Sequence, residues 1–211
     1  MIDSYTKLPY GLYEEILAVP ADLPEEDRVV KIIALLTDQT EKQVLNAPLE
    51  EFSGWCTSAR FLDRETPAPG RVAASYDCGA MRLVPVSDFR KITTALFIDF
   101  QTFIDGDGDP VVPLLSCLMV PEGCAYGEGY DFAEVREAIR NGLSVADVLS
   151  LHAFFFSRYA KFLKDSRTSC ARELRRVRDP QRRADLQERL KAADRMLEAM
   201  LSRTGGDGWR P

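Results

Sequence analysis

The chain has 211 residues, of which 27 are basic and 33 acidic, so its formal net charge at pH 7 is −6. Hydrophobic residues make up 45% and charged residues 28%, as in soluble globular proteins, and the length fits one domain, or one domain with an appendage. The acidic total argues against nonspecific binding of nucleic acid, and no apolar run is long enough to cross a membrane.

The N-terminal residues and the cysteines indicate the cellular compartment in which the protein is expected. The first residues lack the basic and apolar regions of a secretory signal. The five cysteines are odd in number and include no CxxC pair, which favours free thiols over disulfides or a zinc site. We therefore expect a cytoplasmic protein with reduced, mostly buried cysteines.

The first forty residues predict an extended segment followed by a helix. We expect extended structure over residues 5–13, where Pro9 and Gly11 disfavour a helix. Pro24 and the acidic residues 25–27 favour a helix start, because acidic side chains interact well with the positive end of the helix dipole.

Two further helices are expected before residue 62. Thr40 and Gln43 have the spacing of a capping box, in which each residue satisfies a backbone N–H of the other. Apolar residues then recur at intervals of three and four from Leu49 onward, which predicts a helix over residues 48–61 with Leu49 on its apolar face.

A β-hairpin is expected in the middle of the chain. Residues 71–76 and 81–85 alternate in polarity as strands do, and residues 77–80 contain the turn. We expect this hairpin to form a small sheet with the N-terminal extended segment.

The remaining chain predicts mainly helices, separated by a glycine-rich turn at residues 126–130 that presents two tyrosines. The expected helices run from Ser87 or Asp88 to Ile104, from Asp109-Pro110 to Pro121, from Phe132 to Arg140 and from Ser144 to about Arg178. Pro180 either breaks this last helix or starts a new one that lasts until Gly205. The fold class is therefore α+β, predominantly α, with a small hairpin or sheet and a long C-terminal helical hairpin or arm.

The charge is unevenly distributed along the chain. Residues 1–160 contain 13 basic and 25 acidic residues, a net charge of −12, whereas residues 161–195 contain 12 basic and 6 acidic residues, a net charge of +6. We predict an acidic, mostly helical globular domain over 1–160, a basic helical segment over 161–205 and a flexible tail over 206–211, in which Trp209 is either a mobile end or a docking residue.

The basic segment has two notable patterns. An apolar seam with coiled-coil spacing predicts packing against the preceding helix, with self-association as the alternative; it consists of Leu186, Leu190, Ala193, Leu197 and Met200. A basic cluster surrounds the helix break, and is either a solvated surface or a docking face for an acidic partner, nucleic acid or the acidic domain; it consists of Arg172, Arg175, Arg176, Arg178, Arg182 and Arg183.

No residue pattern indicates catalysis, a metal or a cofactor. His152 is the only histidine and lies in an apolar helical run, which is typical of a packed residue rather than a catalytic base. Asp105, Asp107 and Asp109 alternate as in an EF-hand, but the glycine and glutamate that such a loop requires are replaced by Pro110 and Ser116. We therefore expect a non-enzymatic protein without a cofactor.

The segment from Ile92 to Phe156 resembles a family of small tailed-bacteriophage proteins, the tail assembly chaperones. The resemblance covers about a third of the chain and consists of packing residues. It rests on ITTALFIDFQTFI, a short acidic loop, PLLSCLMVPEG, AYGEGYDFAEV, the helical SVADVLSL and the run FFF.

The resemblance implies a binding role in the host cytoplasm, with the tape-measure protein and the tail-tube subunit as partners. Such a chaperone needs accessible apolar side chains for amphipathic helices. The candidates are Phe97, Phe100, Phe103, Phe154, Phe155 and Phe156, whose alternative role is burial by neighbouring helices. Two other functions stay open: a structural or connector protein of the virion, and a nucleic-acid-associated regulator that uses the basic cluster.

Overall fold

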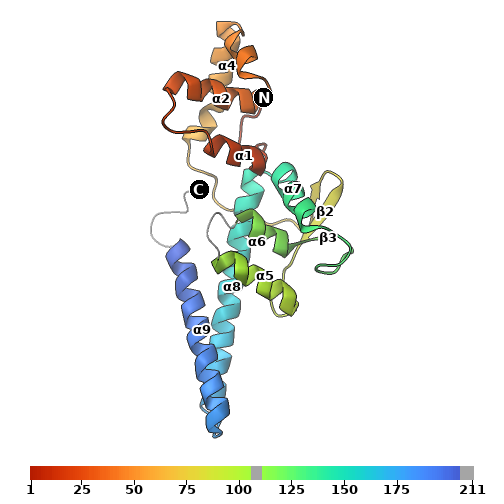
Figure 1. Ribbon diagram of the computed structural model, residues 1–211, viewed down its shortest axis with the longest axis vertical. Helices are drawn as coiled ribbons and strands as arrows, with labels where there is room; N and C mark the ends of the chain where they lie inside the picture. The colour runs from red at the N-terminus through yellow and green to blue at the C-terminus, as the bar shows by residue number, and fades with distance from the viewer. Residues whose placement is uncertain (106–110, 205–211) are drawn as a thin grey trace. The chain divides into compact units, whose positions relative to one another are not determined.

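The computed structural model describes residues 1–105 and 111–204, with side chains up to residue 196 except that of Asp105 (Figure 1). It confirms an α+β fold that is predominantly α. The elements in chain order are α1 (Tyr10–Leu17), α2 (Glu25–Thr37), α3 (Glu41–Leu45), α4 (Leu49–Ala59), the 3-10 helix η1 (Arg60–Asp63), β1 (Tyr76–Cys78), β2 (Met81–Pro85), α5 (Thr94–Asp105), α6 (Val111–Leu118), β3 (Met119–Pro121), α7 (Phe132–Gly142), α8 (Val145–Leu174) and α9 (Pro180–Thr204).

The helices α2, α3 and α4 form as predicted. Thr40 and Gln43 make the capping box: the Gln43 N–H donates to Thr40 Oγ1 at 3.3 Å, and the Thr40 N–H donates to Gln43 Oε1 at 2.8 Å. These helices share a small apolar core, because α2 and α3 bury one face against α4. Its buried members are Val30, Ile33, Ala34 and Val44, and Phe52 and Trp55 pack against them.

The predicted extended segment at residues 5–13 is wrong for most of its length, because α1 begins at Tyr10. Extended pairing is confined to an isolated bridge between Pro9 and Ser144. The Tyr10 N–H donates to Leu143 O at 2.9 Å. Gly11 lies inside the helix because α1 packs closely on α7: an added Cβ there would lie 3.1 Å from Cβ of Arg140.

The predicted hairpin is present, but its first strand is shifted to Tyr76–Cys78. Cys78 pairs with Met81 across a two-residue turn in which Gly79 has a φ of +70°, a conformation that favours glycine. The sheet has the order β1-β2-β3, and β3 pairs antiparallel with β2. The third strand is therefore residues 119–121 and not the predicted N-terminal segment. Because this strand takes up residues 119–121, the helix expected to reach Pro121 ends at Leu118 instead.

The later helices match the predictions with two corrections. α5 begins at Thr94 instead of after Ser87 or Asp88, because Thr93 Oγ1 accepts the Leu96 N–H at 3.2 Å whereas Asp88 binds Arg90. α8 begins after Ser144, whose Oγ accepts the Asp147 N–H at 3.2 Å, and it ends at Leu174 rather than near Arg178. The predicted helix start at Asp109-Pro110 and the predicted flexible tail lie outside the described residues.

The chain divides into two compact units. The first unit joins Met1–Val86 to Thr93–Ala153, and the second unit joins Ser87–Ile92 to the chain from Phe154 onward. The predicted boundary at residue 160 stays a prediction. None of the helices that the structure describes combines the length and the apolar character needed to cross a membrane.

Candidate functional site

The aromatic residues of α5 belong to the first unit. Phe100 is buried, while Phe97 and Phe103 are half-buried. The guanidinium carbon of Arg136 lies 5.5 Å from the centre of the Phe103 ring, which is within the range of a cation–π contact. Ile98, which was not among the candidates, is 57% exposed. The accessible apolar surface of this helix is therefore centred on Phe97 and Ile98.

The aromatic run of α8 belongs to the second unit. Phe155 is buried and packs edge-on against the Phe154 ring, with centroids 5.3 Å apart. Phe154 is half-buried beneath the Arg158 guanidinium, whose carbon lies 5.1 Å from the ring centre. Phe156 is also half-buried. Of the three consecutive rings, one is buried and two keep accessible surface.

The glycine-rich turn is organised by tyrosine hydroxyls. Gly127 and Gly129 both have positive φ, and the Gly127 N–H donates to the Tyr130 hydroxyl at 3.1 Å. The Tyr126 hydroxyl donates to Asp99 Oδ2 of α5 at 2.7 Å. Burial, and next the hydrogen bond to Asp99, raise the pKa of Tyr126. Asp99 was not among the candidates, and a partner 27 residues away leaves no local signal in the sequence.

The predicted basic cluster lies at the turn between α8 and α9, and all six of its arginines are exposed. Arg182 is held by an ion pair with Glu173 at 2.6 Å. In the predicted apolar seam of α9, Leu186 is buried and Leu190 and Ala193 are half-buried. The Tyr159 hydroxyl of α8 lies 3.6 Å from the sulfur of Met196, which is outside that seam. The side chains of Leu197 and Met200 lie outside the described residues.

A basic groove runs along α8 beside α9. It has a volume of about 590 Å³ and is lined by Lys164, Arg167, Thr168, Ala171, Arg172, Arg175 and Leu190. Arg167 is paired with Asp194 at 2.8 Å, whereas Lys164, Arg172 and Arg175 have no ion pair within the described part of the chain. The lining includes no carboxylate, so the groove is suited to an anionic partner.

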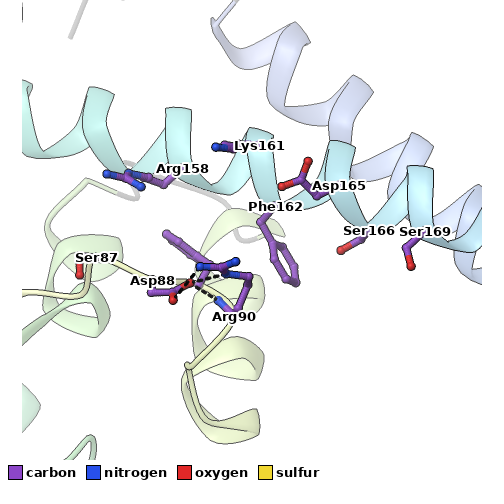
Figure 2. A pocket seen from close by; sticks show the side chains of 10 residues that line it. Ser87, Asp88, Arg90, Arg158, Lys161, Phe162, Asp165, Ser166 and Ser169 are labelled. Carbon is purple, nitrogen blue, oxygen red and sulfur yellow. Dashed lines mark hydrogen bonds and ion pairs between the residues drawn. The ribbon is translucent and has the colours of Figure 1, made fainter.

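A second cavity, of about 330 Å³, lies in the second unit between residues 87–90 and α8 (Figure 2). Asp88 holds the Arg90 guanidinium in a two-pronged ion pair, with N–O distances of 2.9 and 3.2 Å. Figure 2 shows the Phe162 ring pointing from α8 toward Arg90. Asp165 is also in the lining, so carboxylates partly offset the cations here.

The first unit carries an exposed apolar and acidic corner between α3 and α4. Leu45 is 70% exposed and Leu49 is 82% exposed. The prediction that Leu49 faces the apolar interior is therefore wrong, because Leu49 is the first residue of α4 and lies beyond the packed face. Glu41, Glu50 and Glu51 are exposed beside these leucines in the sequence, and none has an ion pair within the described residues.

The charge separates by structural unit more sharply than by sequence segment. The first unit contains 24 acidic and 10 basic residues, a net charge of −14, whereas the second contains 9 acidic and 17 basic residues, a net charge of +8. The two units therefore have opposite electrostatic character.

The described residues include no group of three histidine, cysteine or acidic side chains placed to hold a metal ion. Asp107 and Asp109 of the EF-hand-like pattern, and the side chain of Asp105, lie outside the described part of the chain. All five cysteines are free thiols as predicted, but only Cys78 and Cys117 are buried. Comparison of the chain with protein families, curated proteins and solved structures gave no match.

Proposed function

We propose that this chain is a non-enzymatic bacteriophage assembly factor, a tail assembly chaperone that binds the helical tape-measure protein in the host cytoplasm. The proposal rests on the resemblance of residues 92–156 to that family. The supporting structural observation is the accessible apolar surface of α5, which lies inside this segment and includes Ile98 at 57% exposure beside the half-buried Phe97.

The physical argument concerns the partner. A long amphipathic helix that has not yet been assembled exposes an apolar face, which favours aggregation. A chaperone covers that face with apolar side chains of its own, held on a preformed helix so that little conformational entropy is lost on binding. α5 offers such a surface because the Tyr126–Asp99 hydrogen bond fixes one side of it.

The test is co-expression with the tape-measure protein encoded in the same phage genome. We expect the chain to keep that protein soluble and to co-purify with it. Ile98→Asp should reduce the captured amount at least about ten-fold, because it puts a charge in the apolar contact. Thr102→Asp, which changes an exposed residue one turn further along α5, is the matched control. Failure of the wild-type chain to capture the tape-measure protein would contradict the proposal.

Purified phage particles distinguish the proposal from a role as a virion structural protein. A chaperone is released during assembly, so we expect the chain in infected-cell lysate and not in particles. A fixed stoichiometry in particles would instead identify a structural or connector component.

A further inference from the structure

The basic groove and the acidic corner have matching composition. The groove carries three exposed cations without ion-pair partners in the described part of the chain, Lys164, Arg172 and Arg175, together with apolar Ala171 and Leu190. The corner carries three exposed carboxylates, Glu41, Glu50 and Glu51, and two exposed leucines. Each surface thus combines apolar side chains with charged ones, as protein interfaces do.

We propose that the basic groove of one copy docks on the α3–α4 corner of a second copy, so that the chain self-associates head to tail. The proposal does not depend on the chaperone function. In a head-to-tail arrangement each copy uses its groove on one neighbour and its corner on the next, so a pair of copies keeps one free groove and one free corner. Such contacts produce closed rings or open chains rather than a symmetric dimer.

The geometry of α8 fits an extended partner surface. Residues 164, 168, 171, 172 and 175 recur at helical spacing, so they form one stripe about 16 Å long at the rise of an α-helix. A nucleic acid would contact the cations of this stripe but would leave Leu45 and Leu49 uncovered, and the net charge of −6 on the chain opposes its long-range attraction. A second copy uses both surfaces.

Salt dependence is the first readout. We expect the nuclease-treated full chain at about 100 μM to form oligomers in about 50 mM NaCl and to dissociate in about 500 mM NaCl, with apparent affinity reduced at least about ten-fold, because ions screen exposed charges. Light scattering coupled to size exclusion and sedimentation velocity both measure this.

Two neutralised variants then test the surfaces. The groove variant is Lys164→Ala/Arg172→Ala/Arg175→Ala, and the corner variant is Glu41→Gln/Glu50→Gln/Glu51→Gln. Each should be monomeric alone. Their mixture should form a 1:1 heterodimer and nothing larger, because the groove variant retains only its corner and the corner variant only its groove. An interface between two grooves or between two corners would not show this complementation, and wild-type oligomers larger than a dimer distinguish the head-to-tail arrangement from a two-fold dimer.

The matched control is Arg176→Ala/Arg178→Ala/Arg183→Ala, which removes the same charge from exposed residues outside the groove. It should change the apparent affinity less than about three-fold. Circular dichroism checks that every variant is folded.

Four results would overturn the proposal. The wild-type chain could be monomeric at every salt concentration, or the groove and corner variants could oligomerise as it does. A monomer whose hydrodynamic radius expands with salt would place the contact within one chain. Oligomers that appear only when nucleic acid is present would assign the groove to nucleic acid.

Discussion

The hydroxyl of Tyr126 donates a 2.7 Å hydrogen bond to Oδ2 of Asp99, which joins the glycine-rich turn before α7 to the side of α5. The Tyr126 ring also packs on Phe132 with centroids 5.3 Å apart, so one side chain connects α5 with the start of α7. The hydroxyl and the ring therefore make separable contributions to the first unit.

Replacing Tyr126 with phenylalanine removes the hydroxyl and keeps the ring. We expect the free energy of unfolding to fall by about 1–2 kcal/mol, because the bond has a carboxylate acceptor in a partly buried site. Urea denaturation should show a lower midpoint at an unchanged slope. Tyr130→Phe is the control, since its hydroxyl accepts from an exposed N–H at 3.1 Å and its loss should cost less than about 0.5 kcal/mol. Equal effects for both variants would contradict this assignment.

The buried thiols predict a loss of stability in alkaline solution. Burial raises the pKa of both Cys78 and Cys117 from 9.0 to about 11. The unfolded chain ionises first as the pH rises, so their contribution is fully present below pH 9 and is lost between pH 9 and about 11, by about 2 kcal/mol per thiol.

Urea denaturation from pH 8 to 11 measures this loss. In Cys78→Ala/Cys117→Ala the overall stability should be lower, but its decline with pH should be shallower by the thiol contribution. The tyrosines still ionise in that variant, so the difference between the two curves is the readout. Identical slopes would show that the thiols do not account for the decline.

Two glycines should respond oppositely to alanine. A Cβ on Gly142, at the end of α7, would lie 2.7 Å from both Cα and Cβ of Cys78 in β1, so the strand or the helix must shift. We expect Gly142→Ala to cost about 2–3 kcal/mol. A Cβ on Gly54 in α4 meets nothing within 4 Å, so Gly54→Ala should stabilise the protein by about 0.5–1 kcal/mol through helix propensity. Thermal unfolding of both variants, with opposite shifts in Tm, checks the pair.

Local signals in the sequence predicted the elements whose causes are local. The capping box of Thr40 and Gln43 and the helix start at Pro180 depend on residues within one turn, and both are confirmed. The strand at Met119–Pro121 could not be distinguished from the end of the apolar helix before it, because three residues show no alternation and their pairing partner is β2. The helix at Tyr10 forms although Gly11 disfavours it, because α7 packs against that glycine.

The candidate surfaces also divide into features with local causes, which the sequence predicted, and features with distant causes, which it did not. The six arginines of the basic cluster lie together at the turn between α8 and α9, because the helix break falls among them in the sequence, as their spacing predicted. The exposure of Ile98 and Leu49 and the pairing of Asp99 with Tyr126 depend on distant elements, and no spacing rule identifies them. The charge counts along the sequence predicted that acidic and basic residues lie in different parts of the chain. The fold adds that residues 87–92 belong to the basic unit, which the counts did not predict.

The three consecutive phenylalanines of α8 should differ in their contribution to folding. Phe155 is 1% exposed, so Phe155→Ala should lower the free energy of unfolding by about 3–5 kcal/mol, through lost burial and the remaining cavity. Phe156 is half-buried, so Phe156→Ala should cost about 1–2 kcal/mol and leave the protein folded. If Phe156 also contacts the tape-measure protein, its variant should lose capture at a salt and temperature where it is fully folded. Urea midpoints for both variants, followed by capture with Phe156→Ala, separate the two contributions, and equal destabilisation by the two substitutions would contradict the burial of only one ring.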